Sequence, residues 1–219
     1  SIRDFALREL EVRGGLDEAT ERACKHFVSV AASWDAPGNI ARPLDIEREL
    51  DNLVAAFEWI RAFRASDAAQ ATELVTLALA TEPVLGVRGP VTLAQALLAH
   101  AVTASVDRDI PPDLEARARL AWARTLFTLG QTDAADAQLA EARLVATYAS
   151  NRRAQGWVAL TEAEQAWARG SLPEVLDAVA LAIDAAQSVG DLVLLARAFF
   201  RRGAVLLLRG EHAEARVAL

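Results

Sequence analysis

The amino-acid sequence predicts an all-α fold built from helical hairpins, and three observations support this prediction. Glycine and proline interrupt the chain at intervals of helical length. Alternating runs of β-branched residues, which are typical of strands, are missing. Gly130, Gly170 and Gly210 recur with a constant period of forty, each followed by polar and then small apolar residues. We therefore expect about ten or eleven helices and no strand.

The stretch 1–64 predicts helices that lead into the repeats. Between Asp45 and Arg64, apolar residues recur at spacings of four and three along one helical face. Asp17, Asp45 and Asp113 each stand ahead of an apolar-periodic run, where a carboxylate can accept the free backbone N–H groups of a first turn and oppose the helix dipole. The apolar face comprises Ile46, Leu50, Leu53, Phe57 and Ile60.

Small and apolar residues keep a fixed register around each hinge glycine. Two helices approach closely only where their side chains are small, so these positions predict crossing points within a hairpin. The glycine ends the first helix, because it adopts a positive φ at no steric cost and the next helix then folds back. The positions are Ala123, Ala163 and Gly203 seven residues before the hinge, Ala135, Val175 and Ala215 five after it, and Leu139, Val179 and Leu219 nine after it.

The register continues with Ala142 and Ala182, and as a whole it resembles the tetratricopeptide repeat, whose standard period is about 34 residues. A weaker copy surrounds Gly89, with Ala94, Leu98 and Ala101 at the later positions, although Glu82 replaces the expected small residue. The resemblance implies a right-handed superhelix with a curved surface free for binding. The expected hairpins span about 65–106, 113–150, 153–190 and a truncated 191–219, preceded by the helical linker 1–64.

Two stretches near the N-terminus, "SIRDFALRELEVRGGLDEATERACKHFVSVAASW" and "LDIERELDNLVAAFEWI", carry a second resemblance. They are similar to the region that joins the ATPase module to the helical repeats in large bacterial signal-transduction ATPases that regulate transcription. In that family one helix closes a winged-helix part, and two more lead into the repeats. The matching residues are Ile2, Arg3, Phe5 and Ala6; Arg22, Ala23, His26 and Phe27; and Glu49, Asp51, Asn52, Leu53, Ala55, Ala56 and Trp59.

This resemblance implies that the chain is a sensor arm whose intramolecular partner is an ATPase domain. A P-loop of the form G-x-x-x-x-G-K-[ST] is missing from this sequence, and the only lysine, Lys25, follows no glycine loop. The ATPase is therefore expected elsewhere, together with an output domain such as a helix-turn-helix. Both ends lie within helical periodicity, so we expect a segment of a longer protein.

Composition excludes several classes of function. A chain of 219 residues that is 53% hydrophobic can bury the core of one large or two small domains. The net charge of -7 is spread along the chain without a basic stripe, so direct nucleic-acid binding is not expected. No apolar run reaches the length of about 18 to 20 residues that spans a bilayer, and a signal-peptide profile is missing. The single cysteine, Cys24, excludes an internal disulfide and favours a reducing cytoplasm.

No residue pattern indicates an enzyme, a metal site or a cofactor. The three histidines fall into different expected helices without an H-E-x-x-H motif. Glu162 and Glu164 diverge, because two residues turn a helix through roughly 200°. Lys25 and His26 could lower the pKa of Cys24, but a buried or idle thiol is the simpler interpretation. The histidines are His26, His100 and His212.

Candidate binding residues follow from the standard groove of tetratricopeptide repeats, which the first helix of each hairpin lines. Tryptophan beside arginine would suit an acidic or amphipathic peptide. However, Phe127, Trp167 and Phe200 belong to a stripe spaced three and four apart that favours internal packing, so the other positions are better candidates for the open face. The mapped residues are Arg117, Arg124, Phe127, Trp157, Glu164, Trp167, Arg197, Phe200 and Arg201.

Three classes of function remain open at this point. The first is a non-catalytic sensor domain that holds a protein, a peptide or a small effector in its groove and so changes how the arm restrains the ATPase. The second is a free-standing tetratricopeptide adaptor without an ATPase. The third, an enzyme with an unrecognised helical active site, has no support in the residue spacing. We also expect Ala204, Val205 and Leu207 to lose cover beyond the truncated last hairpin.

Overall fold

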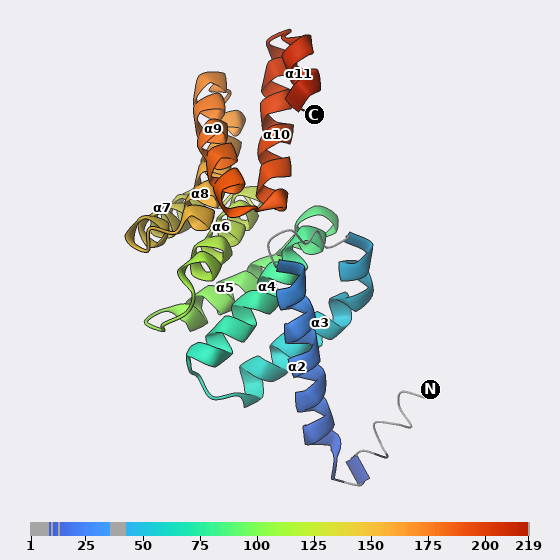
Figure 1. Cartoon of the computed structure of the whole chain (residues 1–219). Coiled ribbons are helices and arrows are strands. Elements are labelled where there is room, and N and C mark those ends of the chain that lie inside the picture. Colours follow the sequence, from blue (N-terminus) through green and yellow to red (C-terminus); the bar gives the residue numbers. More distant parts are fainter. Residues whose placement is uncertain (1–8, 10, 13, 36–42, 219) are drawn as a thin grey trace.

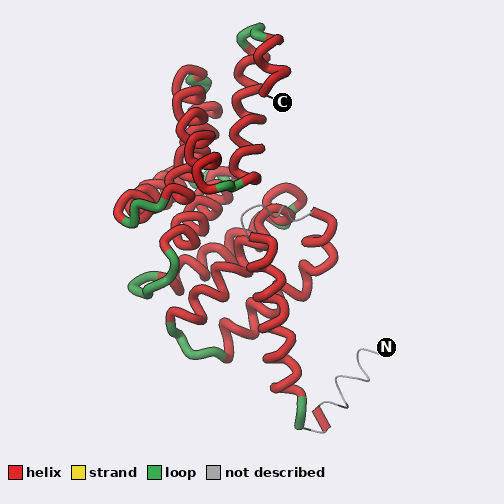
Figure 2. Tube along the Cα trace, viewed as in Figure 1, coloured by secondary structure: helices red, strands yellow, loops and turns green. Residues whose placement is uncertain are grey.

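The structure, a computed structural model, describes residues 9, 11, 12, 14–35 and 43–218. These residues form ten helices and no strand (Figure 2), which confirms the all-α prediction. The helices are α2 (Leu16–Asp35), α3 (Pro43–Phe63), α4 (Ala68–Arg88), α5 (Val91–Ser105), α6 (Pro112–Thr128), α7 (Thr132–Tyr148), α8 (Arg152–Ala168), α9 (Leu172–Val189), α10 (Leu192–Leu208) and α11 (His212–Ala218).

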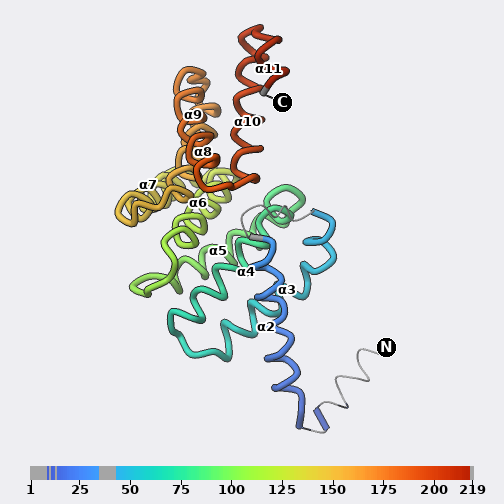
Figure 3. The backbone as a smooth tube through the Cα atoms, viewed as in Figure 1, coloured from blue at the N-terminus to red at the C-terminus, as the bar shows by residue number. Residues whose placement is uncertain are grey.

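Consecutive helices pack against each other along the whole described chain. The chain progresses from α2 and α3 at one end to α10 and α11 at the other (Figures 1 and 3). In addition, α4 contacts α6, α6 contacts α8, and α8 contacts α10. The first helices of the four hairpins therefore form a continuous row, which we call the inner row. No helix in the described part of the chain is long and apolar enough to cross a membrane.

The three hinge glycines share one geometry, as their spacing predicts. Gly130, Gly170 and Gly210 have φ angles of 74, 77 and 76°. Each glycine N–H donates to the carbonyl three residues before it, and the following N–H donates to the carbonyl five residues before its own, at 2.9 to 3.1 Å. Together these bonds satisfy carbonyls left free at a helix end, the arrangement of a Schellman motif. The predicted crossing positions around the hinges are buried, except Leu219, which lies outside the described residues.

A second turn recurs between hairpins, and the sequence pattern did not reveal it. Ser150 and Gly190 also have positive φ angles, of 50 and 71°, and they are separated by the same period as the hinge glycines. The residue after each one caps the next inner-row helix. The side chain of Asn151 accepts a hydrogen bond from the backbone N–H of Ala154, and that of Asp191 accepts one from Leu194, both at 3.0 Å.

The acidic residues expected at helix starts lie within the first helical turn and not at the N-cap position. Asp17, Asp45 and Asp113 are within the first turns of α2, α3 and α6, where their charge opposes the helix dipole. Cap side chains are instead supplied by Asp67 at α4, as well as by the two caps between hairpins. For α6 the N-cap residue is Pro111, whose side chain cannot accept a hydrogen bond.

The weaker copy around Gly89 shares the buried positions of the other hairpins but differs at its turn. Ala94, Leu98 and Ala101 are each no more than 1% exposed. Gly89 combines a φ of 76° with a ψ of 178°, which is not the left-handed helical conformation of the other hinges. The hairpin of α4 and α5 therefore closes through a different backbone path.

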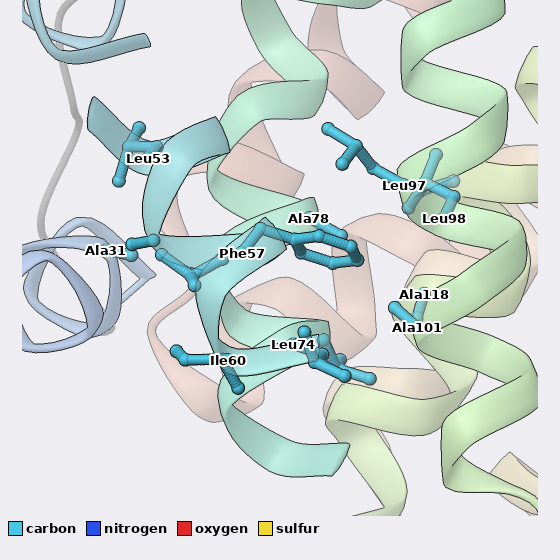
Figure 4. Close-up of a cluster of buried hydrophobic side chains, with 14 of the residues drawn as sticks. Ala31, Leu53, Phe57, Ile60, Leu74, Ala78, Leu97, Leu98, Ala101 and Ala118 are labelled. Atoms are coloured by element: carbon cyan, nitrogen blue, oxygen red, sulfur yellow. The ribbon is translucent and has the colours of Figure 1, made fainter. Parts of the chain in front are cut away.

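Two hydrophobic clusters hold the helices together, and α6 contributes to both. The first joins α2 to α6 around Phe57 and Leu53, which are 1% and 0% exposed (Figure 4). The second joins α6 to α10. The expected boundary after residue 64 falls in the loop between α3 and α4, and the first cluster crosses it. There the Nε2 of Gln70 donates to the carbonyl of Ile60 at 3.2 Å.

The side chains of the final hairpin are less exposed to solvent than expected. Leu207 is 46% exposed, and Ala204 is half-buried. Val205, in contrast, is 0% exposed and belongs to the second hydrophobic cluster, so the expectation is wrong for this residue. The cluster that buries this side chain draws its other members from α6 to α10.

Candidate functional site

The inner row carries two adjoining cavities of about 540 and 250 Å³, both open to solvent. The larger is lined by α4, α6, α8, α10 and the start of α5, and the smaller by α6, α8 and α10. We call the two together the inner groove. Residues that line both cavities are Arg124, Thr128, Glu164 and Arg201.

Six of the nine mapped binding residues line the inner groove. Three others, Arg117, Trp157 and Trp167, are not part of its lining. The six, which come from three successive inner-row helices, are Arg124, Phe127, Glu164, Arg197, Phe200 and Arg201.

The structure places several of the mapped aromatic residues differently from what the sequence predicts. Phe127 and Phe200 are 38% and 64% exposed and face the groove, so the packing interpretation is wrong for both. Trp167 is half-buried and packs against the second hydrophobic cluster. Trp157, expected on the open face, is only 7% exposed. A spacing of three and four residues identifies one face of a helix. It does not distinguish a face packed in the core from a face that lines a groove.

Trp157 is buried because residues distant in sequence satisfy its polar and aromatic groups. Its Nε1 donates to the Oδ2 of Asp191 at 3.1 Å. The guanidinium groups of Arg117 and Arg197 lie 5.8 and 5.4 Å from its ring centroid, within the range of cation–π attraction. The two arginines and the tryptophan occupy equivalent positions of the repeat on α6, α8 and α10. They therefore form a ladder across three inner-row helices, and of these three residues Arg197 alone also lines the groove.

Glu82, which breaks the small-residue register, forms an ion pair with Arg124 across the inner row. The Nη2 of Arg124 lies 3.0 Å from the Oε1 of Glu82, and both side chains are mostly buried. Burial would raise the pKa of Glu82, but Arg124, Arg197 and Arg117 together lower it. Burial would likewise lower the pKa of Arg124, but Glu82 and Glu164 raise it. Both groups are therefore held in their charged forms.

Arg197 and Arg201 have aromatic neighbours but no carboxylate within ion-pair distance in the described part of the chain. Arg197 stacks on Trp157, and Arg201 lies 5.0 Å from the ring centroid of Trp167. Burial and the repulsion of Arg124 lower the pKa of Arg197, although Glu82 and Glu164 partly oppose this. An arginine nevertheless stays protonated in proteins. Arg197 is thus a partly desolvated cation at the groove wall.

Other chemically reactive side chains lie apart from the groove. Among the described residues no group of three or more His, Cys, Asp and Glu side chains could hold a metal ion. Cys24 is buried. Its burial and, to a smaller extent, the charge of Glu73 raise the pKa of its thiol. This shift is opposite in direction to the lower pKa that the neighbouring Lys25 and His26 would produce. Glu162 forms an ion pair with Arg143 of α7.

Glu162 and Glu164 diverge as their spacing predicts, because Glu164 lines the groove while its neighbour pairs with the outer helix. The groove therefore presents fixed charges and exposed apolar side chains, which is an arrangement suited to holding a ligand. The sequence pattern missed Glu82, Pro83, Val87 and Val91 in the lining, since they belong to the irregular first hairpin.

Comparisons with known proteins bear on the fold. No protein-family model matches the sequence, and no curated protein matches it. Among solved structures, the chain is similar to BtubC (BKLC) from P. vanneervenii, with a TM-score of 0.61 over 79% of this chain and 70% of that one. The two sequences are 16% identical over this region, so the likeness concerns the arrangement of the helices alone.

Proposed function

We propose that this chain is the non-catalytic sensor and interaction arm of a bacterial transcriptional regulator, with a signalling ATPase module elsewhere in the full-length, cytoplasmic protein. The hairpins would continue the tetratricopeptide-like pattern as a right-handed superhelix. The observation that carries the proposal is the inner groove, where Arg197, Arg201 and Phe200 face a cavity shared by four successive inner-row helices. The motif order of the N-terminal region supports the link to an ATPase.

The charges of the groove favour recognition over catalysis. Arginine cannot give up its proton near neutral pH, and the lowered pKa of Glu82 keeps that carboxyl ionised. General acid–base catalysis requires a group whose pKa lies near the working pH. The ion pair of Glu82 and Arg124 instead links α4 to α6 within the lining of the larger cavity.

The mechanism of sensing is a shift between conformations of the helical row. A ligand in the larger cavity touches side chains of both α4 and α10. It therefore binds best at one particular curvature of the row, and it can change the conformational equilibrium only by its difference in affinity between curvatures. In the full-length regulator this difference would release or restrain the ATPase module.

The proposal is tested by ATP hydrolysis in the full-length protein. We compare the wild type with Arg197→Gln, in the groove, and with Arg169→Gln, whose side chain is 60% exposed at the end of α8. The groove variant should change the basal rate or abolish its response to effector, whereas the control should match the wild type. A coding region without any nucleotide-binding module would favour the free-standing adaptor. An ATPase indifferent to both substitutions would contradict a sensing role for the groove.

A further inference from the structure

We propose that the larger cavity of the inner groove binds a small amphipathic organic anion, whose acidic group is held by Arg197 and Arg201. This inference rests on the proposed binding function and specifies the chemistry of its ligand. The carboxylate, sulfonate or phosphate group would face α10, and the apolar body would lie toward α4 and the start of α5.

The charge of the cavity favours an anion. Its lining contains three arginines and two glutamates. One glutamate, Glu82, is already paired with Arg124 at 3.0 Å. In the described part of the chain, Arg197 and Arg201 have no carboxylate within ion-pair distance, although Glu82 and Glu164 act on Arg197 from further away. Their aromatic neighbours offer no hydrogen-bond acceptor in the ring plane, so guanidinium N–H groups that do not face a ring can donate to a ligand. A hydrogen bond from a partly desolvated guanidinium to an anion is among the stronger polar interactions in proteins.

Apolar side chains form another part of the cavity wall; most belong to α4 and the start of α5, and Phe200 belongs to α10. Phe200 and Val87 are 64% and 84% exposed, yet both line the same cavity. Pro83 and Val91 complete this wall. Large apolar side chains exposed together around a concavity are typical of ligand sites. A purely inorganic anion would leave this wall uncovered, so the occupant carries an apolar body.

The shape of the cavity favours a small molecule over an extended peptide. A volume of about 540 Å³ lies within the range of about 300 to 1,000 Å³ that is usual for small-molecule sites. Arg124 and Glu164 lie where this cavity adjoins the smaller one, because they line both. A ligand of this size contacts the first and the last hairpin at once, which is the contact that the sensing mechanism requires.

Binding is measured on this chain with anilinonaphthalene sulfonate, an amphipathic anion whose fluorescence rises on binding. Phenylnaphthylamine has the same apolar body without the sulfonate and serves as the neutral probe. The variants are Arg197→Gln, Arg201→Gln and Arg197→Lys, with Arg169→Gln as the control on an exposed turn. Circular dichroism melting of each variant verifies that it is folded at the assay temperature.

We expect either groove substitution to glutamine to raise the Kd of the sulfonate by roughly tenfold to a hundredfold, because a charge-assisted hydrogen bond is lost. Arg197→Lys should retain most of the affinity, the control should stay within about twofold, and the neutral probe should be insensitive to all four changes. A sulfonate Kd unchanged by both glutamine substitutions would overturn the inference.

Two further outcomes separate this inference from the proposed function. An acidic, phenylalanine-containing peptide that displaces the sulfonate at lower concentrations than aromatic carboxylates would overturn the small-molecule occupant in favour of a peptide. If Arg197→Gln alters ATP hydrolysis in the full-length protein but not the sulfonate Kd, the anion inference fails while the sensing function survives. The reverse pattern would support the anion site and contradict the sensing function.

Discussion

The indole Nε1 of Trp157 donates a hydrogen bond to the Oδ2 of Asp191 at 3.1 Å, and this contact joins α8 to the N-cap of α10. The Nε of Arg153 donates to the same oxygen at 2.9 Å. The other carboxylate oxygen caps α10 by accepting the N–H of Leu194 at 3.0 Å. The buried carboxylate of Asp191 thus caps α10 and also positions the Trp157 ring, which Arg197 contacts.

The substitution Asp191→Ala should destabilise the fold by about 3 kcal/mol, because it removes a helix cap, which is worth about 1 kcal/mol, and leaves the buried indole N–H without its partner at a cost of about 1 to 3 kcal/mol. Urea unfolding followed by circular dichroism measures this loss. The matched control is Asp67→Ala, which removes a cap at α4 whose carboxylate accepts the N–H of Gln70. Equal losses in the two variants would show that the link to Trp157 adds nothing.

The same carboxylate predicts how stability depends on pH. Burial would raise the pKa of Asp191, but the N–H of Leu194, Arg153 and Trp157 together lower it below its ordinary value of 3.8. A depressed folded-state pKa stabilises the fold fully above the ordinary pKa, and this stabilisation is lost as the pH falls through the folded-state value. The difference in unfolding free energy between wild type and Asp191→Asn should therefore be largest near neutral pH and shrink below about pH 4. A difference that grows on acidification would contradict the assignment.

Substitution by alanine should have different effects at a glycine in a hinge and at a glycine inside a helix. At Gly170 the φ of 77° is strained for a residue with a side chain although the surrounding space is open, so Gly170→Ala should cost about 1 kcal/mol and Gly170→Asn less. Gly86 lies inside α4, where an added Cβ would only touch Glu82 at 3.7 Å. Gly86→Ala should be neutral or stabilising by up to about 1 kcal/mol. Thermal and urea unfolding of the three variants test this, and a neutral Gly170→Ala would contradict the hinge assignment.

The pair of Glu82 and Arg124 should be energetically coupled. Their side chains are 15% and 21% exposed, so removing one partner leaves a mostly buried charge unpaired. A double-mutant cycle with Glu82→Gln and Arg124→Gln should give a coupling energy of about 1 to 3 kcal/mol. The same cycle on Glu18 and Arg22, whose side chains are 76% and 65% exposed, should give no coupling above experimental error. Equal results for the two pairs would refute the inter-helix role of Glu82.

The repeat could be predicted from the sequence because its constraints are local. A left-handed turn favours glycine whatever surrounds it, so Gly130 and Gly170 mark their hinges in any context. The second turn has no constant glycine in the sequence, because Ser150 adopts a positive φ where Gly190 stands in the next repeat. A serine in the sequence does not predict a positive φ, since a side chain makes that conformation less favourable.

The groove could be predicted only in part, because its decisive contacts join residues far apart in sequence. Helical periodicity identified the inner-row face but could not tell groove from core at Phe200 and Trp157. The burial of Trp157 depends on Asp191, 34 residues away, and the role of Glu82 depends on Arg124, 42 residues away. Nothing in the spacing of either stretch specifies that these side chains meet.

The most direct test of the ligand site is a crystal structure of this chain grown with saturating anilinonaphthalene sulfonate. We expect the sulfonate within hydrogen-bond distance of Arg197 or Arg201 and the rings against Phe200, Val87 and Val91. Electron density for the probe on the outer helices α7 and α9, with the inner groove empty, would contradict the assignment of the groove as the binding site.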